Sequence, residues 1–142
     1  AAWDDTNLYL LADINDDTVL TDNDDIELFF DGDNSKAQSF DANDFQFVFK
    51  YGSTTVTETK HSATTGVQFK TAAKTGGNIV EVKIPWTTLG TTPSAGKLIG
   101  IDVCGDDTDE STVGRETKIA WNTTSNDIWF NPSFMGTGKL NN

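Results

Sequence analysis

The residues best suited to ligand chemistry lie near the carboxyl end of the chain, where large aromatic side chains occur among small polar ones. Trp121, Trp129, Phe130 and Phe134 lie in a stretch rich in Asn, Ser, Thr and Pro. No apolar period in this stretch would bury all four rings in a core. An exposed ring offers a flat apolar surface, which suits the apolar face of a sugar ring. The pattern indicates stacking on carbohydrate, although Trp121 or Trp129 could instead cap the core.

Acidic side chains form three groups along the chain, and each group could hold a hard cation. They are Asp13, Asp16, Asp17, Asp22, Asp24 and Asp25; Asp31, Asp33, Asp41, Asn43 and Asp44; and Asp102, Asp106, Asp107, Asp109 and Glu110. Calcium takes six to eight oxygen ligands, which short loops of Asp, Asn and backbone carbonyls supply. We expect Ca²⁺ as a cofactor, bound by the second group, because its two loops flank consecutive strands. The alternative is that these residues are ordinary turn formers.

The formal net charge of −12 limits the partners of the chain. Nucleic acid and anionic membranes are both excluded as partners, because each is bound through basic patches. Polyanionic glycans are disfavoured unless cations bridge the two surfaces, whereas neutral polymers remain suitable. Cys104 is the single cysteine, so no intrachain disulfide forms, and the single histidine, His61, excludes zinc ligation by several histidines.

Catalysis is the less favoured interpretation. Glu27 or Glu58 could pair with an Asp as in a glycosidase, but neither lies in a recognisable acid and base motif. We therefore expect no enzymatic activity. Three rival functions stay open: a small glycoside hydrolase or lyase, a redox domain that binds haem through His61 and Met135, and a calcium-dependent adhesion domain.

The elements that must position these residues are short strands. Apolar and polar residues alternate with a period of two, and no stretch has a long helical period. Strands are expected around residues 8–14, 26–31, 45–51, 54–59, 67–72, 79–84, 98–103 and 117–121, with a single helical turn at 85–89. Turn signals separate these runs. The chain is thus predicted to be one all-β domain, residues 1–142, folded as a jelly-roll-like antiparallel β-sandwich of about eight or more strands. No apolar run could span a bilayer and no signal peptide is recognisable at Ala1, so we expect a soluble protein.

Five segments occur in an order and spacing that resemble the family 9 carbohydrate-binding modules. They are Trp3–Leu10, Asp24–Asp31, Asp44–Phe49, Ile79–Trp86 and Asn126–Ser133. The resemblance covers most of the chain and implies a calcium-containing β-sandwich that accompanies plant cell-wall enzymes. An extra strand and loop usually precede the Trp3 segment in this family.

The same resemblance implies a set of sugar-binding residues. Such modules hold a terminal sugar between two Trp rings, and one of these falls on Trp129, with polar partners at Asn126, Glu27, Arg115 and Lys50. The second Trp has no counterpart, because its region reads Val19 to Asp24 without an aromatic residue, and Val48 replaces an Arg. These departures favour an open platform that accepts internal chain segments, as in the related family 81, and the sequence does not separate the two families.

Together these observations predict a non-catalytic carbohydrate-binding module. We expect it to bind plant cell-wall β-glucans, including β-1,4 and mixed-linkage glucan, xyloglucan and cello-oligosaccharides. The expected binding residues are Trp129, Trp121, Glu27, Asn126, Arg115, Gln46, Lys50 and Phe130. The module is expected to be a secreted monomer that targets an appended glycoside hydrolase to its substrate. The alternatives are a binder of cellulose or xylan chain ends, or a calcium-dependent adhesion domain without a glycan ligand.

Overall fold

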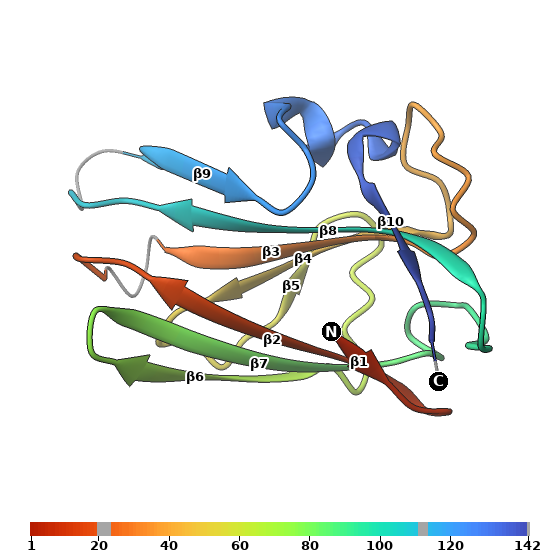
Figure 1. Ribbon diagram of the computed structural model, residues 1–142, viewed down its shortest axis with the longest axis horizontal. Coiled ribbons are helices and arrows are strands. Elements are labelled where there is room, and N and C mark those ends of the chain that lie inside the picture. The colour runs from red at the N-terminus through yellow and green to blue at the C-terminus, as the bar shows by residue number, and fades with distance from the viewer. Residues whose placement is uncertain (20–23, 111–113, 142) are drawn as a thin grey trace.

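The alternating apolar pattern folds into two antiparallel sheets that pack face to face in this computed structural model, which describes residues 1–19, 24–110 and 114–141 (Figure 1). The four-stranded sheet has the order β1 (Ala2–Trp3), β2 (Asn7–Asn15), β7 (Gly77–Pro85) and β6 (Gln68–Lys74). The six-stranded sheet has the order β10 (Gly136–Lys139), β8 (Leu98–Asp107), β3 (Asp25–Asp31), β4 (Asp44–Lys50) and β5 (Thr57–Glu58), and β9 (Thr117–Ala120) pairs with β8. The predicted all-β sandwich is confirmed.

The core lies between the sheets and contains the predicted strand faces. Alternate residues of β3, β4 and β7 are buried there: Ile26, Leu28, Phe30, Phe45, Phe47, Phe49, Val80, Val82 and Ile84. The rings of Phe45, Phe47 and Phe49 stack in a row, with successive centroids 6.0 and 6.2 Å apart. Since period-two alternation sends every second side chain to one face, the other face of β3 and β4 is left for polar groups.

Three local features differ from the sequence expectations. Within residues 54–59 only β5, Thr57–Glu58, is a strand, and the short strands β1 and β10 were not predicted. Both are too brief, and β10 too rich in glycine, to show an apolar alternation. The predicted helical turn at 85–89 is present, because the N–H groups of Thr88 and Leu89 donate to the Pro85 carbonyl.

The aromatic segment near the carboxyl end is more ordered than a plain polar loop. It contains two 3₁₀ helices, η1 (Asn126–Trp129) and η2 (Pro132–Phe134), capped by the side chains of Ser125 and Asn131. Ile128 and Met135 pack with Phe29 and Cys104 in a second, smaller core. Figure 1 shows both helices above β8, on the side of the six-stranded sheet away from β2 and β7. The segment therefore covers part of this outer face.

Among the described residues, no helix is both long enough and apolar enough to cross a membrane.

Candidate functional site

The outer face of the six-stranded sheet carries the polar side chains of β3, β4, β8 and β9. The register places Asp25 opposite Asp106 of β8, and Glu27 opposite Val48 of β4 and Cys104 of β8. In antiparallel pairs, directly opposed residues share one face of the sheet. We call this surface, where the segment 121–135 leaves it open, the polar face.

Glu27 is the centre of a hydrogen-bond network on the polar face. Its exposed fraction is only 7%, and its Oε1 accepts a 2.7 Å hydrogen bond from Gln46 Nε2. The Lys118 ammonium donates to Glu27 Oε2. Gln46 Oε1 accepts in turn from the Thr59 hydroxyl at 2.8 Å. Burial lowers the pKa of Lys118, but the bond to Glu27 and neighbouring carboxylates outweigh burial and leave it above its ordinary value. The network is fixed before any ligand arrives.

Acidic groups extend this network along β3 and β8. Asp106 accepts a 2.9 Å hydrogen bond from Arg115 Nη1 and lies 3.6 Å from Lys118 Nζ. Asp25 Oδ1 and Asp106 Oδ1 are both buried without a hydrogen-bond partner. Burial, together with the charges of Asp106 and Glu27, raises the pKa of Asp25 to about 7. Both oxygens lie below the surface, and the Asp106 oxygen is the one that faces the Lys118 ammonium, so these groups support the network from beneath.

Trp129 lies at the other end of this network and is exposed over 55% of its surface. Its ring meets that of Phe130 edge to face, with centroids 5.0 Å apart. The Lys60 ammonium donates to the Trp129 carbonyl oxygen, and it lies 4.2 Å from the centre of the Phe40 ring. Because Lys60 follows Thr59 directly, the same turn holds both the Trp129 backbone and the Gln46 side chain.

The turn that carries Lys60 is built around the buried Glu58 carboxylate. Its oxygens accept backbone N–H groups of Gln46, Lys60, His61 and Ala63 at 3.2, 3.0, 2.7 and 3.2 Å. Burial raises the pKa of Glu58, but these four donors outweigh it and hold the pKa below its ordinary value. Glu58 is therefore an ionised anchor of the loop, which fits a structural role better than an acid catalyst.

The structure brings together most of the predicted binding residues. The polar face and its rim contain Glu27, Gln46 and Arg115, together with Lys50, which is paired with Asp25. Three more predicted residues are exposed on or next to η1: Asn126, Trp129 and Phe130. Trp121 is placed elsewhere. It is 63% exposed and lines a groove between the two sheets together with Ile101 and Ile119.

Lys60, Lys118 and Phe40 are contributors that the sequence reasoning missed. Lys118 is the fourth residue before Asn122 in a short, weakly alternating strand, and its partner Glu27 is 91 residues away. Such a pairing is fixed only by the order of strands β3, β8 and β9. The available signal was the predicted strand at 117–121, in which Lys118 lies on the face opposite to that of Ile119.

The predicted calcium ligands do converge, as two loops at the ends of β3 and β4. Asp31 and Asp44 are directly paired and fully buried. Asp31 accepts backbone N–H groups of residues 33, 35 and 36, and Asp33 accepts the Asn43 amide at 3.1 Å. Asp41 accepts the Asn43 N–H. Asp44 Oδ1 is buried without a partner, and burial with the charges of three neighbouring carboxylates raises the Asp44 pKa to about 6. Much of the oxygen capacity is used by the turns themselves.

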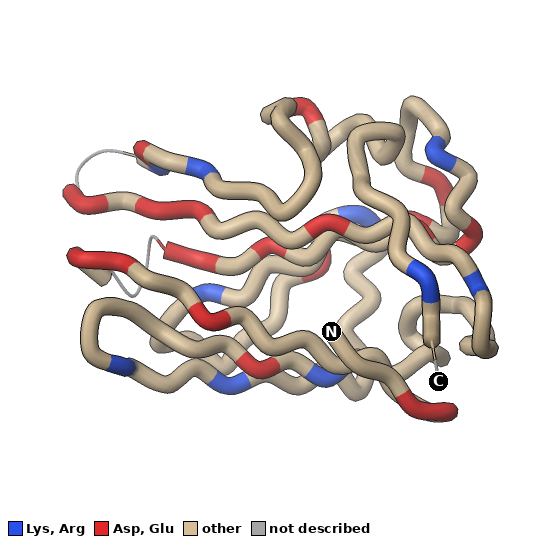
Figure 2. Tube along the Cα trace, viewed as in Figure 1, with Lys and Arg blue, Asp and Glu red and all other residues tan. Residues whose placement is uncertain are grey.

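Members of the first and third acidic groups meet at the end of the sandwich where β2 and β8 end and β3 begins. Figure 2 shows Asp and Glu gathered there. One carboxylate oxygen each from Asp16, Asp24 and Asp107 lie within 4.8 Å of one another, and Asp16, Asp17 and Asp109 form a similar group. Asp24 is fully buried and accepts the Thr108 N–H, while the buried Thr108 hydroxyl has no partner. Asp22 lies outside the described residues.

Comparison with known protein families gives one match over the whole chain: residues 1–142 match the carbohydrate family 9 binding domain-like family. Endo-1,4-beta-xylanase A of Thermotoga neapolitana is 36% identical over 146 residues, which is 97% of this chain and 13% of the xylanase. Endo-1,4-beta-xylanase A of Thermoanaerobacterium saccharolyticum is 33% identical over 151 residues, which is 96% of this chain and 12% of that enzyme. This chain therefore spans about an eighth of the length of such relatives.

Two solved structures show the same fold. A family 9 carbohydrate-binding module from Caldicellulosiruptor kristjanssonii in complex with cellotriose superimposes with a TM-score of 0.87 and 27% identity, over 98% of this chain and 71% of that one. A structure of a family 9 module from the same organism in complex with glucose has a TM-score of 0.86 and 27% identity, over 97% of this chain and 72% of that one.

Proposed function

Because this chain belongs to the carbohydrate family 9 binding domain-like family, we propose that its polar face and Trp129 bind a neutral β-linked glucan or its oligosaccharides. The chain is a binding module and not a catalytic domain. The family resemblance inferred from the five sequence segments is thereby confirmed for family 9, and family 81 has no further support.

One observation carries the proposal: an exposed Trp ring is tied through Lys60 and Thr59 to a prearranged network of Gln46, Glu27 and Lys118. In this proposal a glucosyl ring lies with its apolar face on Trp129. Its hydroxyl groups donate to Glu27 and accept from Gln46 and Lys118. Hydrogen bonds with charged groups are stronger than neutral ones, so they give direction to an otherwise non-directional stack.

The neighbours' ligands favour glucose units. The two superimposed modules carry cellotriose and glucose. The hydroxyl groups of β-glucose are equatorial, so the faces of its ring carry only C–H groups and can stack on a rigid Trp ring. Binding of internal segments of mixed-linkage glucan or xyloglucan is the finer part of the proposal. The rival is a chain-end site for cellulose or xylan. The region of the second clamping Trp, Val19 to Asp24, contains no aromatic residue, and its residues 20–23 lie outside the described residues.

Isothermal titration calorimetry with cellotriose tests the proposal. Trp129→Ala should weaken binding by about tenfold or more. Loss of stacking alone costs on the order of 1 kcal/mol, and a sugar that is no longer stacked also loses the geometry of its hydrogen bonds. Trp121→Ala, which removes an exposed Trp of the groove between the sheets, is the matched control and should keep the affinity. Equal losses in both variants, or no binding by the unaltered chain, would contradict this site.

Affinity electrophoresis separates the two ligand modes. In gels that contain xyloglucan, mixed-linkage β-glucan or hydroxyethyl cellulose, an open platform predicts retardation that Trp129→Ala abolishes. A chain-end site predicts no retardation by these long polymers, since they carry few ends, together with tight binding of cellotriose.

We also propose that Ca²⁺ stabilises the loops of this module, at Asp31, Asp33, Asp41, Asn43 and Asp44 or at Asp16, Asp24 and Asp107. The unpartnered buried oxygens of Asp44 and Thr108 support a hard cation at either place. A cation that binds only the folded state raises the unfolding temperature. Unfolding temperatures with Ca²⁺ and with EDTA, compared for Asp33→Asn and Asp24→Asn, identify which group is used. An unfolding temperature that is the same in Ca²⁺ and in EDTA would contradict a stabilising calcium site.

The setting of the module follows from its relatives. This chain corresponds to about an eighth of the length of two xylanases. That match supports the proposal that the module is appended to a secreted plant-polysaccharide-degrading enzyme, where it raises the local substrate concentration. We propose that it acts as a monomer, because its net charge of −12 disfavours self-association.

A further inference from the structure

The Trp129 ring is exposed although it follows a firmly anchored residue. Its neighbour Ile128 is fully buried in the second core, whereas Trp129 is 55% exposed. The Phe130 ring, which meets it edge to face, is itself 46% exposed. A ring held only by another exposed ring keeps much of its rotational freedom, and this freedom is lost when a ligand stacks on it. Stacking on Trp129 therefore depends on what else fixes this ring.

The end of η1 receives such a contact from a distant part of the chain. The last carbonyl groups of a helix lack partners within it, and the Trp129 carbonyl is one of these groups. None of the four residues of η1, Asn126–Trp129, is basic. The Lys60 ammonium, 69 residues away in the sequence, donates to this carbonyl and so satisfies the open end of the helix.

The same ammonium also lies close to two aromatic rings. Lys60 Nζ is 4.2 Å from the centroid of the Phe40 ring and 5.8 Å from that of the Trp129 ring. Both distances are within the range of cation–π attraction. Phe40 is half-buried and packs against the second core. The cation thus links the exposed ring of Trp129 to the packed ring of Phe40.

The backbone of Lys60 is held as well as its side chain. Its N–H donates to Glu58 Oε1 at 3.0 Å, within the turn that this buried carboxylate organises. The preceding residue, Thr59, donates its N–H to the Gln46 carbonyl at 3.0 Å and its hydroxyl to the Gln46 side chain at 2.8 Å. Lys60 therefore holds Trp129 at a fixed place relative to Gln46 on the polar face.

We propose that Lys60 is the positioning residue of the carbohydrate site: its ammonium holds the Trp129 backbone and ring in the orientation that stacks on a glucosyl unit. This role rests on the proposed function and names the group that pre-organises its stacking surface. Lys60 does not bind the sugar itself, because its ammonium is engaged by the Trp129 carbonyl and the Phe40 ring. A ring that is ordered in the free protein loses less freedom on binding, so this positioning raises the affinity.

Relaxation of the ¹⁵N-labelled indole N–H groups tests the placement of the ring without any ligand. In Lys60→Met, which keeps an apolar stem but loses the charge and the donor, the order parameter of the Trp129 indole should fall from about 0.85 to about 0.6 or lower. Lys60→Arg should restore it, because a guanidinium also donates to a carbonyl and lies over aromatic rings.

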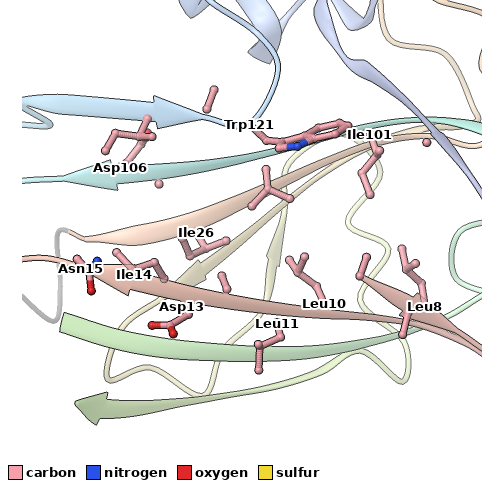
Figure 3. A pocket seen from close by; sticks show the side chains of 18 of the residues that line it. Leu8, Leu10, Leu11, Asp13, Ile14, Asn15, Ile26, Ile101, Asp106 and Trp121 are labelled. Atoms are coloured by element: carbon pink, nitrogen blue, oxygen red, sulfur yellow. The ribbon is translucent and has the colours of Figure 1, made fainter. Parts of the chain in front are cut away.

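Two other Trp indoles serve as internal references in the same spectra. Trp86 is buried and donates its indole N–H to a backbone carbonyl at 2.8 Å. Trp121 is exposed at the groove between the two sheets (Figure 3). The order parameters of both should stay the same in Lys60→Met. An unchanged order parameter of the Trp129 indole in this variant would overturn the proposal.

Calorimetry with cellotriose tests whether this order matters for binding. Lys60→Met should weaken binding by about three- to tenfold, whereas Lys60→Arg should bind within about twofold of the unaltered chain. Lys74→Met, which removes an ammonium from the four-stranded sheet, is the matched control and should keep the affinity. Equal losses of affinity in Lys60→Met and Lys74→Met would overturn the proposal.

A double variant shows whether Lys60 acts through Trp129. In a Trp129→Ala background, Lys60→Met should cause no further loss of affinity, because the ring that Lys60 positions is absent. A further loss would mean that Lys60 binds the sugar directly, which contradicts a positioning role.

These measurements distinguish failure of the positioning role from failure of the proposed function. If the unaltered chain does not bind cellotriose, the proposed function fails, and the indole order parameter alone decides whether Lys60 holds the ring. If Trp129→Ala weakens binding but Lys60→Met changes neither affinity nor order, the function stands and the positioning role fails. Urea denaturation checks that Lys60→Met is folded, and Lys60→Gln takes its place where it is not.

Discussion

Lys118 is the residue whose loss should disturb the polar face most, because it is the counter-ion of two carboxylates. Its side chain is 9% exposed, and those of Glu27 and Asp106 are 10% and 11% exposed. Removing one partner of a buried ion pair leaves an uncompensated charge. Lys118→Met should therefore lower the free energy of unfolding by about 3 kcal/mol, as measured by urea denaturation.

A double variant separates the lost charge from lost packing. Adding Glu27→Gln to Lys118→Met should restore part of the stability, because the neutral amide no longer requires a counter-ion. Lys74→Met is the surface control. Its partner Asp13 is 61% exposed, so the loss there should stay below about 1 kcal/mol. Equal losses for Lys118→Met and Lys74→Met would show that the Glu27 pair is solvated.

Cys104 offers a chemical probe of the segment that carries Trp129. Burial raises the pKa of its thiol to about 12, and it packs against Ile128 and Met135. Only the thiolate reacts, so iodoacetamide should modify the folded chain on the order of 10³-fold more slowly than the urea-unfolded chain. Mass spectrometry follows the reaction. Rapid labelling of the folded chain would mean that η1 and η2 open readily from the six-stranded sheet.

At the scale of the elements, the turn between β6 and β7 depends on two adjacent glycines with different roles. Gly77 has a φ of 146°, and a Cβ there would lie 2.0 Å from the Ile14 carbonyl oxygen. Gly76 has a φ of 71° with open space around it. Gly77→Ala should thus destabilise the sandwich by more than about 2 kcal/mol and Gly76→Ala by about 1 kcal/mol, measured by thermal unfolding. Similar losses of stability in the two variants would mean that the Ile14 backbone of β2 can move away from the added methyl group at little cost in free energy.

The strands that the sequence predicted are those in which burial imposes a period of two. The alternating phenylalanines of β4 and the valines of β7 follow this rule, because one face of each lies in the core. β1 and β10 could not be predicted from the sequence, because segments of two and four residues are too short to reveal an alternation of apolar and polar residues. The pairing of the strands could not be predicted either, because alternation indicates which side chains face the core but not which strands are neighbours in the sheet.

The candidate site was predictable only in part. Glu27, Gln46 and Trp129 could be named from residue type and family resemblance. Their connection through Lys60 could not, because it depends on where the Glu58 turn meets η1, 69 residues farther along the chain. The acidic clusters were visible as clusters, but the meeting of Asp16 with Asp107 required the order of β2, β3 and β8 in space.

At the scale of the whole molecule, the net charge of −12 and several buried carboxylates set how stability responds to pH. Burial raises the pKa of Asp25 to about 7 and of Asp44 to about 6, and also raises the pKa of Asp107. In the unfolded chain each titrates near its ordinary value of about 4. Between these values the folded state holds more protons than the unfolded state, so folding is favoured by acid over that range.

Without divalent cations, the free energy of unfolding should therefore be highest near about pH 4 to 5, fall as the pH rises toward about 7, and level off above that. Below this range Glu58 has the opposite effect on stability, because folding lowers its pKa. Its contribution to the free energy of unfolding is lost as the pH falls through the pKa that it has in the folded state. Bound Ca²⁺ would hold Asp44 or Asp107 ionised and flatten the fall between about pH 4 and 7. Calorimetric unfolding temperatures across this range, in EDTA and then in Ca²⁺, measure both effects. Stability that rises from about pH 4 to 7 in EDTA would contradict the buried, proton-binding carboxylates, because ordinary surface carboxylates contribute no such acid preference.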